Sequence, residues 1–384
     1  MQFEFATAAR IIFGAGTAEQ LPGLASAMGR RVLLVTGAKP DRHIQRIDAL
    51  AKAGLACTVL SVAGEPSLDD IEAARAEARK SRCDMVIAIG GGSVIDSGKA
   101  LAALIPNPGA ALDYLEVIGA GEKLTASPMP FIALPTTAGT GAEVTKNAVL
   151  SSSEHGVKVS LRDERMLPDI AVVDPLLTHS LPPAATASTG MDALTQLLEP
   201  FVSHLANPLT DALCEAGLRR AGRSLRRVLA EPDAADARAD MALASLLGGL
   251  ALANVKLGAV HGFAGVLGGL TGAPHGTVCA ALLPGVMQAN LKALTERAAD
   301  SPALEKYHRA AQLLLDSPAA SAQDALDWLK ETSRLFAIPR LGELGVDKTG
   351  FAEIVAKSQA SSSMKGNPIL LDARELTGIL AGAL

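Results

Sequence analysis

The sequence predicts an α/β N-terminal domain with a doubly wound, mostly parallel sheet, followed by an all-α C-terminal domain. Two patterns support this fold class. Short apolar runs alternate with helical patterns along the first half, which is the rhythm of βαβ units. After Leu181-Pro182-Pro183, β-branched runs give way to long Ala- and Leu-rich helical patterns. A length of 384 residues also exceeds one ordinary core. We therefore expect one domain over residues 1–183 and another over residues 184–384.

Five apolar runs are expected to form the strands of the sheet. They are bounded by turn residues and are short enough for buried strands. These runs cover residues 31–36, 57–60, 84–89, 130–135 and 170–173. The proline pair and the change in composition together place the domain boundary after the fifth run.

Composition excludes several classes of partner. A net charge of −5 argues against a general nucleic-acid binder, and no basic stripe is present. The four cysteines lack CxxC or other paired spacing, and the first residues do not resemble a signal peptide. A reducing, cytoplasmic location is therefore the expectation.

The most apolar region, residues 241–273, is expected to form two buried helices. Asn254, Lys256 and His261 interrupt it and glycines recur within it, so a membrane span is not expected. No membrane partner is predicted.

A glycine run directly follows the third expected strand. It reads Gly90-Gly91-Gly92-Ser93 and opens a helical pattern that contains Asp96 and Lys99. Glycines allow backbone N–H groups to approach a phosphate, and a helix N-terminus adds its positive end. The run therefore predicts a pyrophosphate cradle, although it is not a GxGxxG fingerprint. A plain strand-to-helix turn is the alternative.

A second loop, Pro135-Thr136-Thr137-Ala138-Gly139-Thr140-Gly141-Ala142-Glu143-Val144-Thr145, follows the fourth expected strand. Its hydroxyls and exposed N–H groups suit hydrogen bonds to a ribose or phosphate. Taken alone, the loop is also consistent with a capped helix start.

Four polar residues of the C-terminal half suggest a metal site. Asp192 and Gln196 are four apart and so share one helix face, while His261 and His275 stand in two later His-Gly steps. Such N and O ligands suit Fe(II) or Zn(II). Most of the other histidines are expected at the surface; these are His43, His155, His179, His204 and His308.

Taken in order, these motifs resemble the iron-containing (group III) alcohol dehydrogenase family. The resemblance rests on GGGSxxD with a following lysine, PTTAGTGAEVT, Lys158, DPxL at 174–177, GxDALxxxxE at 190–199 and the HG…PHG pair of His261 and His275. It covers roughly residues 10 to 290.

The resemblance implies a dinucleotide-binding first domain and a helical second domain that carries the metal. It implies that Asp192, His261 and His275 are catalytic and bind the metal together with the residue at 196. It also implies contacts to NAD or NADP from a larger set of residues. These are Gly37, Gly91, Gly92, Ser93, Asp96, Thr136, Thr137, Thr140, Val149 and Lys158.

Two departures from the family pattern concern the metal site. Gln196 stands where many members carry histidine, and a carboxamide oxygen is a weaker ligand than imidazole, so the metal preference is expected to move from Fe(II) toward Zn(II) or another ion. Gly265 replaces a histidine that many members use in proton relay, which removes one acid-base candidate.

A third departure concerns the cofactor. Many members place an acidic residue where this chain has Gly37, and a carboxylate there would repel a ribose 2′-phosphate. With Gly37, and with Lys39 or Arg42 within reach, NADP becomes possible beside NAD. The alternative is that both basic residues only face solvent.

The resulting hypothesis is a metal-dependent, NAD(P)-linked alcohol dehydrogenase or aldehyde reductase that acts on small alcohols, expected to be a homodimer as similar proteins commonly are. The rivals are a metal-independent reductase of a keto or unsaturated acid, similar to maleylacetate reductases, and a lyase similar to dehydroquinate synthase. A third rival is a cofactor-binding protein without turnover.

Overall fold

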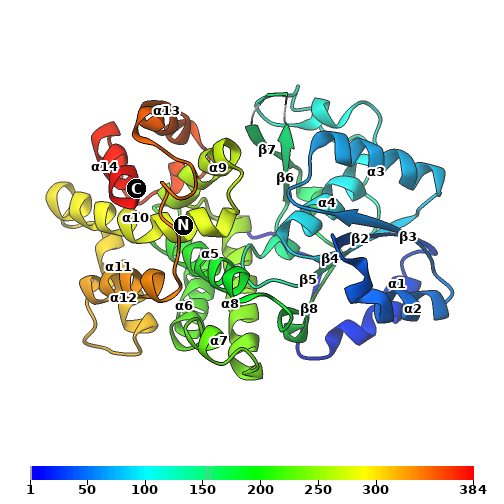
Figure 1. The fold of residues 1–384 in the computed structure, drawn as a ribbon, viewed down its shortest axis with the longest axis horizontal. Helices are drawn as coiled ribbons and strands as arrows, with labels where there is room; N and C mark the ends of the chain where they lie inside the picture. Colours follow the sequence, from blue (N-terminus) through cyan, green and yellow to red (C-terminus); the bar gives the residue numbers. More distant parts are fainter. Residues whose placement is uncertain (1, 153, 156) are drawn as a thin grey trace. The chain divides into compact units, whose positions relative to one another are not determined.

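The computed structural model describes residues 2–152, 154–155 and 157–384, which form two compact units. The sheet unit comprises Ala6–Thr137 and Gly141–Thr178. The helical unit comprises His179–Leu384 together with Ala138–Thr140 and the first residues of the chain. Figure 1 colours both units along the sequence.

The sheet unit is built on a parallel sheet in the order β1-β8-β5-β4-β2-β3 (Figure 1). Its strands are β1 (Arg10–Phe13), β2 (Arg31–Gly37), β3 (Ala56–Val62), β4 (Met85–Gly90), β5 (Phe131–Pro135) and β8 (Ile170–Val173). The order reverses direction at β2, because β3 lies on one side of it and β4 on the other. In such sheets, ligands bind outside the carboxyl ends of the strands at this switch point.

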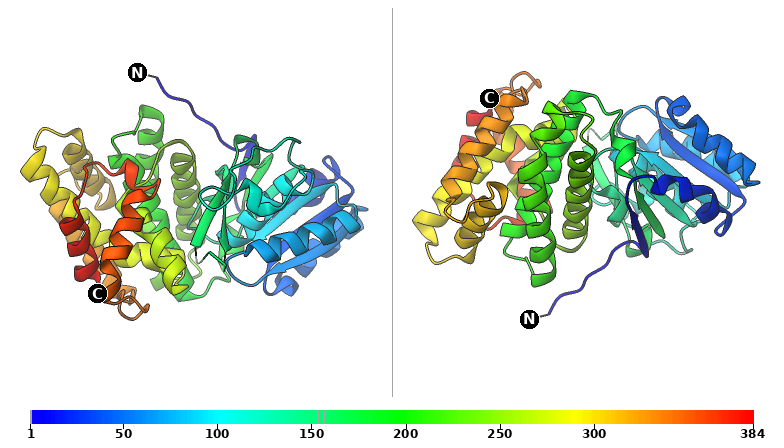
Figure 2. Two further views of the ribbon diagram at one scale, coloured as in Figure 1. Left: turned by 90° about the horizontal axis from the view of Figure 1, so that it is seen from above. Right: turned by 90° about the horizontal axis from the view of Figure 1, so that it is seen from below.

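Helices cover both faces of the sheet, as the views from above and below in Figure 2 show. They are α1 (Leu21–Ser26), α2 (Ile44–Lys52), α3 (Leu68–Lys80) and α4 (Gly92–Leu104). Alternate residues of β2 point to opposite cores: Leu34 packs with α1 and α2, whereas Leu33 packs with α3 and α4. Because both faces are covered, the central strands carry continuous apolar runs, such as Val32–Val35 in β2 and Met85–Ile89 in β4.

A two-stranded antiparallel hairpin lies between β5 and β8 in the sequence and forms a separate sheet. It consists of β6 (Asn147–Ser152) and β7 (Val157–Arg162). Its burial alternates along β6, where Ala148 and Leu150 are buried and Val149 is exposed. The sequence analysis did not predict this hairpin or the short strand β1.

The helical unit is organised around α5 (Pro183–Val202), which is buried on nearly all sides from Gly190 onward. The other helices are α6 (Pro208–Ser224), α7 (Arg227–Ala230), α8 (Ala235–Asn254), α9 (Ala259–Thr271), α10 (His275–Arg297), α11 (Pro302–Leu314), α12 (Ala322–Leu335), α13 (Phe351–Ala360) and α14 (Ala373–Ala383). Helices α6, α8 and α10 pack directly on α5 (Figure 2). The predicted fold class is confirmed in both halves.

Pro183 of the proline pair is the first residue of α5. Proline is favoured at this position because its missing N–H has no partner within the helix. Short 3-10 segments connect many of the elements: η1 (Thr17–Gln20), η2 (Pro40–His43), η3 (Ala111–Tyr114), η4 (Ala142–Val144), η5 (Glu164–Met166), η6 (Pro175–Thr178), η7 (Lys348–Gly350) and η8 (Met364–Gly366).

The apolar region 241–273 forms α8 and α9, which meet at a bend of 95°. By length and composition, α10 alone, or α8 and α9 together, could cross a membrane. In the most apolar window of α10, 56% of the residues are buried inside the protein, where the helix packs against α5, α9, α12 and α14. Packing within the helical unit therefore accounts for its apolar character.

Candidate functional site

Asp192 and Gln196 lie one turn apart in the middle of α5. Their side chains belong to the same helix face and each residue is only 1% exposed. A buried carboxylate is costly unless a cation or hydrogen-bond donors compensate it. The Asp192 Oδ1 atom makes no hydrogen bond within the described part of the chain, so it is available to a cation.

Glu199, seven residues after Asp192 on α5, fixes the position of His261. Its carboxylate accepts hydrogen bonds from the Val260 N–H at 2.7 Å and the His261 N–H at 3.5 Å, at the start of α9. A carboxylate is favoured there by the positive end of the helix. The His261 Nδ1 atom also lies 2.7 Å from Glu199 Oε2. In the neutral ring, Nδ1 donates its proton to Glu199, and Nε2 then carries the lone pair that could bind a metal.

His275 begins α10 directly after Pro274. The next residue, Gly276, allows α10 to approach α5 closely, since a Cβ atom there would lie 2.6 Å from the backbone oxygen of Ser188. This close approach brings His275 to Asp192, and the two side chains are 37% and 1% exposed.

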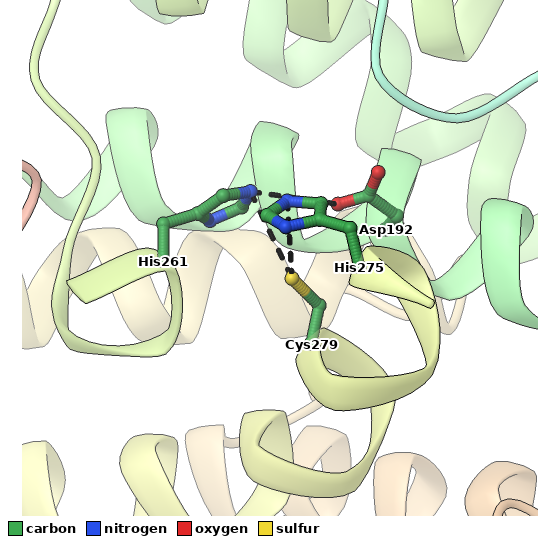
Figure 3. Close-up of side chains that lie close together, drawn as sticks. All are labelled: Asp192, His261, His275 and Cys279. Carbon is green, nitrogen blue, oxygen red and sulfur yellow. Dashed lines mark hydrogen bonds and ion pairs between the residues drawn. The ribbon is translucent and has the colours of Figure 1, made fainter. Parts of the chain in front are cut away.

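Four side chains converge at this point: Asp192, His261, His275 and Cys279 (Figure 3). Asp192 Oδ1 lies 3.4 Å from His261 Nε2 and 3.8 Å from His275 Nε2. Cys279 Sγ lies 3.9 Å from His261 Nε2 and 3.6 Å from His275 Nε2. One ligand atom from each of the four residues lies within 4.8 Å of all the others, which is the arrangement of a metal site. The structure thus brings together three of the four residues predicted to bind a metal, and adds Cys279.

The electrostatics of the cluster favour positive charge. Burial alone would lower the pKa of His275, but Cys279 and Asp192 outweigh it and raise this pKa to about 9. For His261, burial is likewise outweighed by Cys279, Asp192 and Glu199, and its pKa lies well above the usual value. Burial would raise the pKa of Asp192, yet His275 and His261 hold it below the ordinary range. The negative charge that causes these shifts lies beside both rings and would also favour a bound cation.

Only one of the two polar atoms of the Gln196 amide has a hydrogen-bond partner among the described residues. Its Nε2 donates to the Gly139 carbonyl oxygen at 3.0 Å, and this partner requires the nitrogen to face Gly139. Its Oε1 is buried and has no hydrogen-bond partner among the described residues. An orphaned buried oxygen one turn from Asp192 is compatible with the predicted metal contact, which stays a prediction.

Sequence reasoning missed Cys279 and the role of Glu199. The four cysteines form no CxxC pair, so their spacing from one another does not indicate a metal ligand. The available signal is the sequence spacing from His275, because Cys279 lies four residues after it on the same helix face. Glu199 lies two helical turns beyond Asp192, at a spacing that also keeps it on the same side of α5.

The two predicted phosphate loops lie next to each other in the sheet unit. They follow β4 and β5, which are adjacent parallel strands, and the Thr136 N–H donates to the Gly90 carbonyl at 2.9 Å. A Cβ atom on Gly91 would lie 3.2 Å from Thr137 Cγ2. Gly91 precedes α4 as its N-cap, so Gly92 and Ser93 form its first turn, as the glycine run predicted. Thr140 belongs to the helical unit with Gly139.

Asp96 and Val149, both predicted to contact the cofactor, bind each other. The Val149 N–H donates to Asp96 Oδ2 at 3.0 Å, and Asp96 Oδ1 lies 3.0 Å from the buried Lys99 Nζ. Lys158 pairs with Glu65 at 2.5 Å. These polar groups therefore organise the sheet unit around α4 and the hairpin, and their contacts to a cofactor stay predictions.

A basic cluster follows the end of β2. Gly37 is the last residue of β2, and a Cβ atom there would meet no described atom within 4 Å. Burial, Arg46 and Arg42 lower the pKa of His43. Its Nδ1 atom is buried without a hydrogen-bond partner in the described ranges, while the residue as a whole is partly exposed.

Comparisons with known proteins agree with this geometry. The family model "Iron-containing alcohol dehydrogenase" matches residues 8–175, and the model "Fe-containing alcohol dehydrogenase family, C-terminal" matches residues 186–384. A 1,3-propanediol dehydrogenase of Klebsiella pneumoniae is 35% identical over 362 residues, covering 92% of each chain.

Two solved structures extend the likeness to the fold. A 1,3-propanediol oxidoreductase has a TM-score of 0.92 at 32% identity, covering 100% of both chains. A sulfoacetaldehyde reductase from Bifidobacterium kashiwanohense, in complex with NAD+, has a TM-score of 0.87 at 28% identity, covering 100% of this chain and 99% of that one. By its sequence motifs, its fold and these matches, the chain belongs to the iron-containing alcohol dehydrogenase family.

Proposed function

We propose that the chain is a metal-dependent, NAD(P)-linked alcohol dehydrogenase that transfers hydride between a small alcohol, or the corresponding aldehyde, and nicotinamide. The convergence of Asp192, His261 and His275 in the helical unit is the observation that carries this proposal. The names of the relatives, which include 1,3-propanediol dehydrogenases, support a small alcohol as substrate.

Asp192, His261 and His275 would hold a divalent metal ion. Their donor set of one carboxylate and two imidazoles fits Zn(II) or Fe(II), and the orphaned Asp192 Oδ1 supplies the anionic ligand. When bound, the ion supplies a Lewis acid for the substrate oxygen. Glu199 orients His261 by accepting its Nδ1 proton, and the burial of Asp192 excludes water from one side of the site.

The sheet unit would bind the nicotinamide cofactor. Gly91, Gly92 and Ser93 present backbone N–H groups at the positive end of α4, which suits the pyrophosphate. Thr136 and Thr137 lie beside them at the end of β5. The NAD+ complex of the related sulfoacetaldehyde reductase supports NAD as one cofactor.

NADP is a second cofactor that we include in this proposal. Gly37 lies at the switch point of the sheet, where Arg42 and Arg46 both act on His43. Positive charge at the end of β2, without a carboxylate at 37, would accept a 2′-phosphate.

Replacement of Asp192 tests the proposal. In Asp192→Asn the anionic ligand is lost, so both bound metal and net turnover of nicotinamide with a panel of small alcohols and aldehydes should fall together. Asp211→Asn on α6, which removes a carboxylate paired with Lys306 away from the cluster, is the control and should leave both unchanged.

Each rival function has its own outcome in this experiment. Unchanged turnover in metal-free Asp192→Asn protein would point to a metal-independent reductase of a keto or unsaturated acid. Product formation without net change in nicotinamide would point to a lyase similar to dehydroquinate synthase. Cofactor binding without turnover of any substrate would leave a binding protein.

A further inference from the structure

The fourth side chain of the cluster, beside Asp192, His261 and His275, is a cysteine. Cys279 is fully buried, and its Sγ contacts the Nε2 atoms of His261 and His275, the two nitrogens that face Asp192. The thiol points into the cluster in Figure 3, toward the same point as the two rings. Cys279 follows His275 by one turn of α10, just as Gln196 follows Asp192 on α5.

The distances within the cluster match the edges of a tetrahedral metal site. With ordinary zinc bond lengths, ligand atoms are about 3.3 Å apart for an N–O pair and about 3.6 Å apart for an N–S pair. The N–O separations here are 3.4 and 3.8 Å, and the N–S separations are 3.6 and 3.9 Å. These four of the six edges are within a few tenths of an ångström of tetrahedral values, and the two remaining pairs, N–N and O–S, lie within 4.8 Å.

We propose that Cys279 is a metal ligand in this chain and binds as a thiolate, so that the site has one carboxylate, two imidazoles and one sulfur. This inference rests on the proposed metal-dependent function, and it names the residue that completes the site where Gln196 stands in place of histidine. Coordination deprotonates a thiol outright, which explains how a sulfur ligand is compatible with full burial.

Gln196 then has a structural role and is not the fourth metal ligand. Its Nε2 is engaged by the Gly139 carbonyl, which ties α5 to residues 138–140. Cys279, in contrast, contacts His261 and His275 through its Sγ, and both of these contacts lie inside the cluster. Sulfur is a soft ligand and favours Zn(II) over Fe(II), so the sulfur ligand makes this a zinc-preferring member of an iron-named family.

Substitution with Co(II) tests the ligand directly. A thiolate bound to Co(II) gives an intense charge-transfer band in the near ultraviolet, whereas imidazole, carboxylate and carboxamide ligands do not. The full-length protein is prepared with Cys57→Ser and Cys83→Ser, because these two neighbouring, partly exposed thiols could bind Co(II) themselves. We expect one Co(II) per chain and the thiolate band.

Four further substitutions in this background, at three positions, assign the band. Cys279→Ser and Cys279→Ala should abolish it and weaken Zn(II) binding by at least about tenfold, since even changes to groups behind the ligands cost this much. Cys214→Ala, at the other buried cysteine, should keep the band. Gln196→Ala should keep it too. Zinc should also lose its advantage over Fe(II) in Cys279→Ser.

The inference is overturned if the bound Co(II) shows no thiolate band, or if the band survives in Cys279→Ser. The first result requires only that the Cys57→Ser, Cys83→Ser protein folds, because it needs no substitution within the cluster. Zinc-dependent turnover without a thiolate band would leave the proposed function standing and refute only the sulfur ligand. Full turnover without any bound metal would instead refute the metal-dependent function on which the inference rests.

Discussion

Glu199 shows how one residue supports the site without belonging to it. Its carboxylate holds the start of α9 through Val260 and fixes the ring of His261 through Nδ1. The two contacts together set the direction of the His261 Nε2 lone pair. Neither contact can be read from the sequence, because Glu199 and His261 are 62 residues apart.

Replacing Glu199 should therefore weaken metal binding. Glu199→Gln removes the charge that stabilises the Nδ1 proton, and we expect metal affinity to fall about 10- to 100-fold. Metal affinity is measured by competition with a chelator of known strength. The control is Glu215→Gln, which breaks only a surface pair with Arg309. Equal metal affinity in Glu199→Gln and wild-type protein would contradict this role.

Gly37 is expected to set the choice between NAD and NADP. Gly37→Asp adds a carboxylate at the end of β2, and we expect kcat/KM for NADP to fall by at least about tenfold relative to NAD, because close like charges cost several kcal/mol. Gly37→Ala adds a Cβ into open space and should leave the preference unchanged. The same loss in both variants would show that charge at 37 is not the cause.

At the scale of elements, two glycines of α9 are expected to respond oppositely to the same substitution. Gly265 is exposed, and a Cβ there meets no described atom within 4 Å. A Cβ on Gly262 would lie 2.8 Å from Met364 Cε and 3.4 Å from its Cα. The first site has room for a side chain, whereas the second is a packing contact between α9 and η8.

Alanine at these two positions tests the packing of α9. Gly265→Ala should raise the free energy of unfolding by about 0.5–1 kcal/mol, because alanine loses less conformational freedom in a helix. Gly262→Ala should lower it by about 1–3 kcal/mol through overpacking. Chemical denaturation of the full-length protein measures both. A destabilised Gly265→Ala would indicate that the space beside residue 265 is filled.

The sequence predicts an element best when its residues have the same kind of surroundings along its whole length. Central strands such as β2 and β4 carry continuous apolar runs, Val32–Val35 and Met85–Ile89, because helices cover both faces of the sheet. Strand β1 is four residues long at an edge, and hairpin β6–β7 mixes serine and lysine with its buried residues, so neither shows a clear pattern. Tertiary context decides these elements.

The same distinction applies to the candidate site. The spacing of Asp192 and Gln196 predicted one helix face, and the structure places both on α5. Cys279 enters the cluster only because Gly276 lets α10 approach Ser188 on α5. Ser188 and Gly276 are 88 residues apart in the sequence, so their close approach depends on how the two helices pack. The residue spacing within a single motif does not reveal such a contact.

For the molecule as a whole, the buried carboxyl of Glu143 is expected to make stability depend on pH. Burial raises the pKa of Glu143 from 4.5 to about 7, despite the opposing effects of a backbone hydrogen bond and of Lys99. Below pH 4.5 both folded and unfolded chains keep the proton. As the pH rises toward 7, only the unfolded chain releases it, and the free energy of unfolding falls.

Glu143→Gln isolates this effect. The difference in unfolding free energy between wild type and variant should change by about 3 kcal/mol between pH 4.5 and pH 7 and then level off, with wild type the less stable at the higher pH. The exposed Glu122→Gln serves as control. A constant difference across this range would show that Glu143 is ionised in the folded protein.

We propose that this chain needs a metal held by Asp192, His261 and His275 to oxidise or reduce small substrates with nicotinamide. The most direct measurement removes all metal with a chelator, verifies the loss by elemental analysis, and restores Zn(II) or Fe(II) in steps while following nicotinamide absorbance. We expect turnover to be absent from the metal-free protein and to rise in proportion to bound metal until one ion per chain is bound. Full turnover in verified metal-free protein would contradict the claim.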